Sequence, residues 1–250
     1  MPDDHRLSAI TASHAAELLI QLRRGHHGSG SQLGKIGDAH ANELILDLLR
    51  AARPEDGFLS EESAPDPSRL SKRRVWIIDP LDGTREYAER ERDDWAVHIA
   101  LTECGLPSAC AVALPALGLV YSTASPVALP PLPAGPLKIL VSRSRPPALA
   151  ERVAAKLGAE LVPMGSAGAK AMAVLRGEAH AYLHAGGLSE WDSCAPVGVA
   201  LASGLHASRI DGSPCLYNQP DISMPDLLIC RPECAPALLA AIAAAIEPGN

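Results

Sequence analysis

Apolar positions recur along the chain at two periods, and the period predicts which segments are helices and which are strands. A helical period runs through LSAITASHAAELLIQLRR (7–24) and DAHANELILDLLRAAR (38–53), with a Gly-rich loop, GHHGSGSQLGKIG (25–37), between them. Short apolar runs then predict strands at 57–60, 74–79 and around 95–102, 109–114 and 118–122.

Strands and helices alternate after the Pro-rich segment SPVALPPLPAGP (125–136). The predicted strands are 137–142, 159–164, 181–184 and 226–230, and the predicted helices are 147–157, 167–177, 193–204 and 235–247. This alternation predicts a layered α/β fold. We expect one unit with two sub-halves, 1–130 and 137–250, and the Pro-rich segment is either their boundary or a long surface loop.

Composition and charge narrow the class of protein. With 250 residues and 47% apolar content, the chain can bury a sizeable core. No apolar run approaches the roughly 18 residues that span a bilayer, and the acidic start does not resemble a secretory signal. The six cysteines form no CxxC pair, which predicts reduced thiols in a cytoplasmic protein. The net charge of −7 argues against binding to nucleic acid polymers, but it allows a small anionic ligand if metal ions cancel the charge locally.

Acidic residues gather at three places where a predicted strand ends, and α/β folds place their sites at such ends. The segments are LSEES (59–63), WIIDPLDGTRE (76–86) and EWDSCAP (190–196). Each has an ordinary alternative when taken alone: Glu61 and Glu62 as a solvated pair, 79–84 as a capped turn, and Asp192 as the cap of the following helix. Their combination favours a functional site.

The second acidic segment is the most informative. Pro80 cannot continue a strand ladder and Gly83 permits a tight turn, so we expect a turn that brings Asp79 and Asp82 to the same side. Two carboxylates that close repel each other unless a cation lies between them, and magnesium prefers such oxygen ligands. The turn also exposes the carbonyl of Leu81, and the residues after it open a predicted helix whose amides face a phosphate.

Together these motifs resemble the lithium-sensitive, magnesium-dependent phosphomonoesterases, a superfamily of inositol monophosphatases, fructose-1,6-bisphosphatases and 3′(2′),5′-bisphosphate nucleotidases. The resemblance extends from about residue 8 to residue 247. It implies a layered αβαβα sugar-phosphatase fold, two or three Mg²⁺ ions and inhibition by lithium. It also allows a homodimer.

The resemblance also implies a role for each acidic residue. One ion would be held by Glu61, Asp79 and the Leu81 carbonyl, and a second by Asp79, Asp82 and Asp192. In a two-metal site, one ion lowers the pKa of the attacking water and both stabilise the transition state.

The same resemblance implies that Glu61 and Thr84 position the water and that Asp38 hydrogen-bonds the Thr84 hydroxyl. The amides of Gly83 and Thr84 would face the phosphate. The segment GKIGDAHAN lacks the threonine that family members usually carry before this aspartate, so the alternative is that Asp38 caps the second helix.

Three features favour the nucleotidase branch, whose bacterial members are the CysQ-like enzymes. DGTREYAERERDDWAVHIAL (82–101) resembles the CysQ pattern, VSRSRPP (141–147) resembles a nucleotidase loop, and GSAGAKAM (165–172) carries a lysine typical of nucleotidases. Arg143, Arg145 or Lys170 would hold a second phosphate. The alternative for the two arginines is a solvated surface loop.

Other residues near these motifs have open roles. Ser166 is a ribose or phosphate contact or a helix cap, and Asp192 is also assigned to substrate binding. His184, where nucleotidases often have arginine, is a ligand contact or an ordinary strand residue.

The sequence therefore predicts a magnesium-dependent phosphatase that converts adenosine 3′,5′-bisphosphate to AMP and phosphate. The alternative is an inositol-1-phosphate or fructose-1,6-bisphosphate phosphatase with the same metal site. A catalytically silent relative that regulates a partner is disfavoured, because the predicted ligand set is intact. We expect a small phosphorylated substrate as the binding partner, and neither a nucleic acid polymer nor a membrane.

Overall fold

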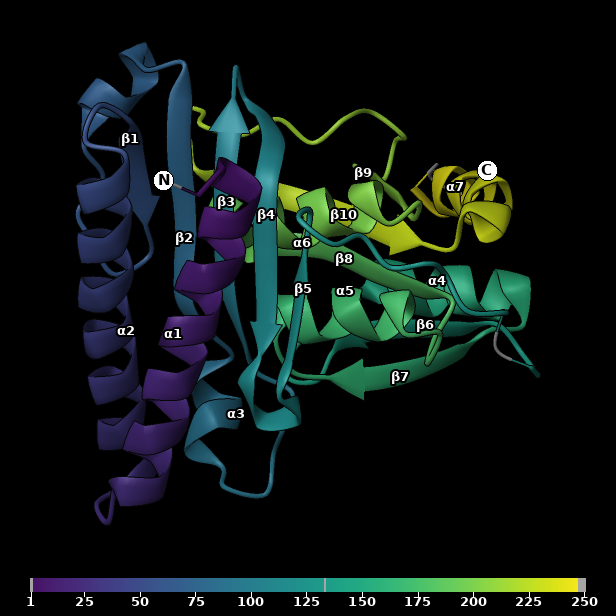
Figure 1. Cartoon of the computed structure of the whole chain (residues 1–250). Helices are drawn as coiled ribbons and strands as arrows, with labels where there is room; N and C mark the ends of the chain where they lie inside the picture. Colours follow the sequence, from purple (N-terminus) through teal and green to yellow (C-terminus); the bar gives the residue numbers. More distant parts are fainter. Residues whose placement is uncertain (1, 133, 247–250) are drawn as a thin grey trace.

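The computed structural model describes residues 2–132 and 134–246, and two five-stranded sheets form its framework (Figure 1). The first sheet has the order β1-β2-β3-β4-β5, with β1 parallel to β2 and the other neighbours antiparallel. Its strands are β1 (Gly57–Ser60), β2 (Arg74–Asp82), β3 (Ala96–Glu103), β4 (Leu106–Leu114) and β5 (Leu119–Ser122).

The second sheet has the order β7-β6-β8-β10-β9. In it, β6 runs parallel to both β7 and β8, and β10 is antiparallel to β8 and β9. Its strands are β6 (Lys138–Ser142), β7 (Glu160–Met164), β8 (Ala181–Ser189), β9 (His206–Ser208) and β10 (Ser223–Cys230).

Helices cover both sheets and fill the space between them (Figure 1). The helices are α1 (Asp4–Gly25), α2 (Gly30–Ala52), α3 (Thr84–Ala88), α4 (Ala148–Leu157), α5 (Ala167–Leu175), α6 (Glu190–Ala202) and α7 (Ala235–Ile246). Helices α1 and α2 lie on the outer face of the first sheet, α5 and α6 lie between the sheets, and α4 and α7 cover the far face of the second. This arrangement confirms the predicted layered αβαβα fold.

Three hydrophobic cores separate these layers, and the alternation of side chains along each strand assigns residues to them. On β2, Trp76 and Ile78 pack toward α1 and α2, whereas Val75 and Ile77 pack toward α5 and α6. The aromatic content is only 3%, so small side chains, chiefly alanine, fill much of the central core and let α5 and α6 approach both sheets closely.

The predicted loop over 25–37 was wrong, because α2 already begins at Gly30. Ser29 caps it by accepting a hydrogen bond from the amide of Gln32 at 3.4 Å. The glycines that suggested a loop serve close packing: a Cβ at Gly34 would lie 2.6 Å from Cγ2 of Thr84. The helix thereby passes directly beside the second acidic segment.

Other boundaries differ by a few residues. Helix α6 begins at Glu190 rather than 193, and β8 continues to Ser189. The short strand β9 was not predicted, and the last residue of the predicted helix 235–247 lies outside the described residues.

The Pro-rich segment connects the two sheets, since β5 ends at Ser122 and β6 begins at Lys138. Its Leu129 packs against the central core. That residues 1–130 and 137–250 are sub-halves of one unit stays a prediction. All six cysteines are free thiols. Within the described part of the chain, no helix combines the length and apolarity needed to cross a bilayer.

Candidate active site

The two aspartates of the second acidic segment share one side of β2 because the strand carries a bulge. Residues three apart on a regular strand face opposite sides. Here Asp79 pairs with His98 and Asp82 with Ala96, so three steps on β2 face two on β3. The extra residue accommodates Pro80 and returns Asp82 to the side of Asp79. The expected turn is therefore a bulged strand, but the same-side placement is confirmed.

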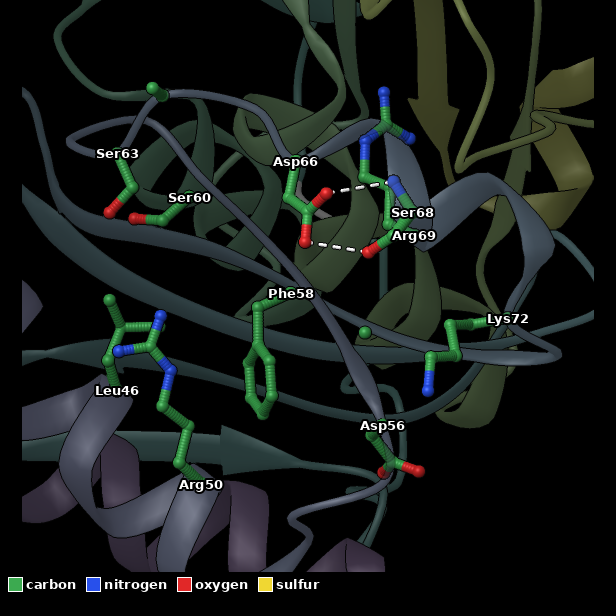
Figure 2. A pocket seen from close by; sticks show the side chains of 12 residues that line it. Leu46, Arg50, Asp56, Phe58, Ser60, Ser63, Asp66, Ser68, Arg69 and Lys72 are labelled. Atoms are coloured by element: carbon green, nitrogen blue, oxygen red, sulfur yellow. Dashed lines mark hydrogen bonds between the residues drawn. The ribbon is translucent and has the colours of Figure 1, made fainter.

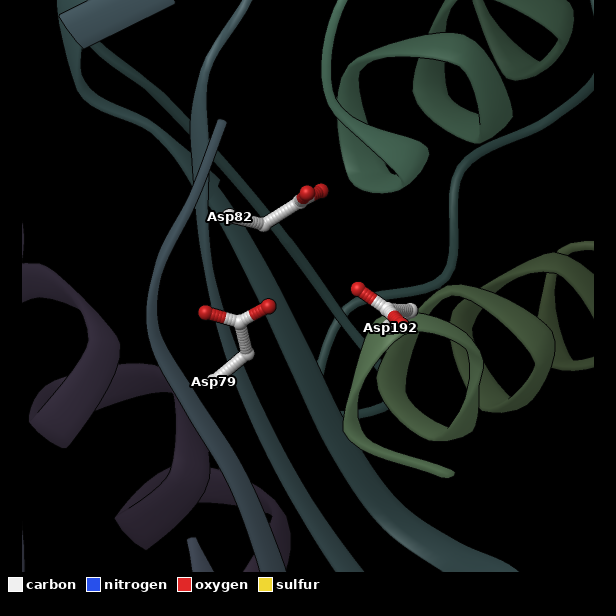
Figure 3. A group of neighbouring side chains, drawn as sticks. All are labelled: Asp79, Asp82 and Asp192. Atoms are coloured by element: carbon white, nitrogen blue, oxygen red, sulfur yellow. The ribbon is translucent and has the colours of Figure 1, made fainter. Parts of the chain in front are cut away.

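Asp192 points toward these two aspartates from helix α6 (Figure 3). Each of the three offers one carboxylate oxygen, and these oxygens lie within 4.8 Å of one another. Asp192 lies in the first turn of α6, where its Oδ2 accepts a hydrogen bond from the amide of Ser189 at 2.6 Å. It therefore both caps its helix and belongs to the cluster.

The cluster concentrates negative charge in a buried place. Burial, followed by the charges of Glu61 and Asp82, raises the pKa of Asp79 well above its ordinary value. Burial and the charge of Asp82 raise the pKa of Asp192 to about 7. Among the described residues, Oδ2 of Asp79 is buried without a hydrogen-bond partner. Clustered oxygen donors with an unsatisfied carboxylate fit a hard divalent cation such as Mg²⁺.

Asp82 is stabilised in its charged form instead. Burial acts to raise its pKa, but His98 and Lys170 outweigh that effect and the pKa falls to about 2. Its Oδ2 accepts hydrogen bonds from the Ser166 hydroxyl at 2.5 Å and from the Gly168 amide at 2.8 Å. The start of α5, which follows β7 of the second sheet, thus holds a carboxylate of β2 in the first sheet.

Glu61 and Leu81 flank the cluster. Glu61 lies on the loop after β1, exposed as a residue, and its carboxyl lies near Asp79 and Asp82. The carbonyl of Leu81 accepts a hydrogen bond from the Thr84 hydroxyl at 3.3 Å. Their roles as metal ligands stay predictions.

Asp38 lies in the interior of α2, so the alternative that it caps this helix is wrong. Burial, followed by the charges of Glu62 and Glu61, raises its pKa to about 7, and the nearby Thr84 hydroxyl partly offsets this. Asp38 therefore lies near Thr84, but that hydroxyl donates to the Leu81 carbonyl, so its predicted hydrogen bond to Asp38 stays a prediction. A carboxyl that titrates near neutral pH is suited to accept a proton.

A pocket of about 440 Å³ opens beside the carboxylate cluster. Its lining includes all of the predicted substrate contacts: Gly83, Thr84, Arg143, Arg145, Ser166, Lys170 and Asp192. Arg143 is held by Glu86 at 2.7 Å and by Glu89 at 3.2 Å. Arg145 is exposed and, in the described part of the chain, has no ion-pair partner.

Lys170 is a buried cation in the wall of this pocket. Its Nζ donates to the carbonyls of Ser166 at 2.5 Å and Gly165 at 3.1 Å, and lies 4.9 Å from the ring centre of Tyr182. Burial lowers its pKa to about 8. Two carbonyl groups and one aromatic ring therefore hold the ammonium group at the pocket.

The remaining predicted residues make contacts within the protein, and their roles toward a substrate stay predictions. Ser166 caps α5 by accepting from the Ala169 amide at 3.0 Å. Gly83 adopts a left-handed conformation with φ +89°, and a Cβ there would lie 3.2 Å from Cβ of Ser166. Helix α3 has only five residues, so its dipole adds little at Gly83 and Thr84. His184 Nε2 lies 2.6 Å from the carbonyl oxygen of Gly186, and the ring lines the pocket.

Sequence reasoning missed His98, Tyr182 and Asp94. Asp94 accepts a hydrogen bond from the Gly165 amide at 2.6 Å and so fixes the loop before α5. The hydroxyl of Tyr182 is buried at the pocket without a partner among the described residues. A single polar residue in an apolar strand, or in a loop as at Asp94, gives no sequence signal that separates such roles from ordinary packing.

A second, smaller pocket of about 120 Å³ lies beside β1 and contains Phe58 and Arg50 (Figure 2). Several of its polar groups are already hydrogen-bonded: Asp66 accepts from the amide and hydroxyl of Ser68, and Arg69 donates to Asn218. None of the predicted catalytic or metal-binding residues lines it. We therefore place the candidate site in the larger pocket.

Comparison with known proteins provides independent evidence on the family of this chain. The model of the inositol monophosphatase family matches residues 9–127 and 137–247. The chain is 54% identical over 242 residues to the 3′-phosphoadenosine 5′-phosphate phosphatase of Mycobacterium tuberculosis, covering 92% of this chain and 89% of that protein. It is 31% identical over 191 residues to the 3′(2′),5′-bisphosphate nucleotidase CysQ of Escherichia coli, covering 72% and 77%.

A solved structure shares the fold. The crystal structure of CysQ from Bacteroides thetaiotaomicron superposes with a TM-score of 0.73 at 24% identity, over 90% of this chain and 96% of that one.

Proposed function

The chain belongs to the inositol monophosphatase family, and we propose that it is a magnesium-dependent 3′(2′),5′-bisphosphate nucleotidase. Its substrate would be 3′-phosphoadenosine 5′-phosphate, which it would hydrolyse to AMP and phosphate. The observation that carries the chemistry is the cluster of Asp79, Asp82 and Asp192 beside a pocket with cationic walls. The 54% identity to a mycobacterial phosphatase of that name supports the substrate.

The metal site would use groups from both halves of the fold. Asp79, Asp82 and Asp192 would hold two or three Mg²⁺ ions together with Glu61 and the Leu81 carbonyl. When bound, the ions supply Lewis-acid chemistry: they neutralise phosphate charge and make a water molecule more acidic.

The chain's own residues would orient that water and take its proton. In this reaction a water oxygen forms a bond to phosphorus, and the bond between phosphorus and the ester oxygen breaks. Glu61 and the Thr84 hydroxyl would orient the water for in-line attack. The neighbouring Asp38, whose pKa is about 7, would draw the proton through Thr84.

The second phosphate of the substrate would meet the cationic side chains that line the same pocket. Lys170 is fixed in place by carbonyl groups, and Arg145 is exposed without an acidic partner in the described ranges. Arg143 already pairs with Glu86 and Glu89, so we assign the second phosphate first to Arg145 and Lys170.

A substrate panel tests this assignment. Purified protein with Mg²⁺ is offered 3′-phosphoadenosine 5′-phosphate, inositol 1-phosphate and fructose 1,6-bisphosphate, and phosphate release is measured. We expect the highest kcat/KM with the nucleotide. Equal or better turnover of either other substrate would refute the nucleotidase assignment, and no turnover of any of them would favour a silent relative.

A further inference from the structure

His98 is a buried polar residue at the centre of the molecule that the proposed function leaves without a role. It lies on β3, opposite Asp79 in the strand ladder and beside the bulge of β2. Its side chain is completely buried, and its neighbours Ala96 and Ala100 on the same face belong to the apolar central core. An imidazole in such surroundings is costly unless its polar atoms are paired.

The two ring nitrogens face the two parts of the metal site. Nδ1 lies 3.0 Å from the carbonyl oxygen of Trp191, the residue immediately before Asp192, and a carbonyl only accepts, so Nδ1 carries the hydrogen. Nε2 lies 3.2 Å from Oδ2 of Asp82. This second contact is electrostatic rather than an aligned hydrogen bond, because Nε2 has no hydrogen-bond partner among the described residues. One ring thus spans from Asp82 on β2 to the first turn of α6.

The start of α5 is shaped around this ring. A Cβ at Gly168 would lie 2.2 Å from Nε2 of His98, so only glycine lets the helix approach. The amide of Gly168 donates to the same Oδ2 of Asp82 that His98 contacts. With the Ser166 hydroxyl, three groups converge on Oδ2, and Oδ1 of Asp82 is left for another ligand.

We propose that His98 is a positioning residue that sets the separation of Asp82 and Asp192, and so preorganises the divalent-metal site without touching ion or substrate. The inference rests on the proposed metal-dependent function. Asp82 and Asp192 come from opposite sides of the pocket, and Mg²⁺ demands near-ideal octahedral geometry. Outer groups that orient metal ligands typically contribute 10- to 100-fold in metal affinity.

Two substitutions separate the two contacts of the ring. In His98→Asn the amide takes the place of Nδ1 and keeps the bond to Trp191, but it cannot reach Asp82. In His98→Gln the amide takes the place of Nε2 and keeps the Asp82 contact. Val97→Ala is the matched control, because Val97 is equally buried on β3 but packs toward α1 and α2.

The readout is Mn²⁺ affinity of the full chain, measured by electron paramagnetic resonance, alongside the thermal midpoint in EDTA. We expect His98→Asn to weaken Mn²⁺ binding by about 10- to 100-fold. His98→Gln should weaken Mn²⁺ binding less than His98→Asn does. Val97→Ala should lower the thermal midpoint and leave the Mn²⁺ affinity unchanged. At saturating Mg²⁺, the KM of His98→Asn for the substrate should return to the wild-type value.

Unchanged Mn²⁺ affinity in His98→Asn, or an equal loss in Val97→Ala, would overturn the positioning role. If His98→Asn does not fold, His98→Gln and Gly168→Ala decide. Gly168→Ala displaces the ring without removing it and should also weaken Mn²⁺ binding, and wild-type affinity in both variants would overturn the proposal. A wild-type chain that binds no Mn²⁺ would instead refute the proposed function itself.

Discussion

Replacing Asp192 by asparagine should make the metal-free protein more stable while it removes activity. Asparagine has the same shape, and its Oδ1 still accepts the hydrogen bond from the Ser189 amide that Asp192 accepts at 2.6 Å. The substitution therefore deletes one negative charge from the cluster and leaves the start of α6 intact. Without a bound cation, that charge opposes folding.

The magnitude follows from the pKa of Asp192, which rises from 3.8 to about 7 on folding. A raised carboxyl pKa means that the folded state prefers the protonated form, so stability is lost as the pH rises from 3.8 to about 7 and changes little above that. A shift of about three pKa units corresponds to about 4 kcal/mol of unfolding free energy at pH 8. Because the neighbouring carboxylates share the repulsion, we expect Asp192→Asn to raise the unfolding free energy by about 2–4 kcal/mol. At pH 4.5 the gain should shrink to about 1 kcal/mol.

The assay is urea unfolding in EDTA at pH 8 and pH 4.5, repeated at pH 8 with Mg²⁺. Asp47→Asn, an exposed carboxylate on α2, is the control and should change stability little at either pH. Mg²⁺ should stabilise the wild type far more than Asp192→Asn. A variant that is less stable than the wild type in EDTA at pH 8, or equally stabilised at both pH values, would refute the electrostatic reasoning.

Three further predictions concern activity. Asp79→Asn removes a carboxylate shared between the proposed ions and should lower kcat by at least about 100-fold with the circular dichroism spectrum unchanged; near-normal kcat would exclude Asp79 as a ligand. Arg145→Ala should raise KM for the bisphosphate by about 10-fold and KM for a monophosphate much less, and equal increases would remove Arg145 from the second-phosphate site. The pKa of Lys170 is lowered to about 8, so this side chain loses its positive charge as the pH rises through 8. KM of the wild type for the bisphosphate should therefore rise above pH 8. A Lys170→Gln variant with the same dependence of KM on pH would contradict this.

The layered fold could be predicted from the sequence because the hydrophobic period changes between segments. The apolar runs before and after the Pro-rich segment each supply one sheet. The start of α2 could not be predicted, because glycine and serine are poor helix formers in isolation. Glycine is needed at position 34 because the helix packs closely against Thr84, a contact that only the folded structure shows.

The residues of the site that belong to sequence motifs could be predicted. Those that contribute as single, isolated residues could not. The bulge of β2 follows from Pro80 in principle, although the sequence suggested a turn rather than a strand that continues. The structure also shows contacts that the sequence did not predict: Arg143 pairs with Glu86, and Ser166 hydrogen-bonds Asp82 and caps its own helix. His98 left no sequence signal, since its importance depends on which atoms face its two ring nitrogens.

The central claim is that carboxylates from opposite sides of one pocket share divalent ions. Its most direct test is a crystal structure of the full chain grown with Mn²⁺, with anomalous diffraction used to locate the ions. We predict anomalous peaks within coordination distance of the carboxylate oxygens of Asp79, Asp82 and Asp192. A map without a peak between these three residues, from crystals of protein that hydrolyses the nucleotide with Mn²⁺, would contradict it.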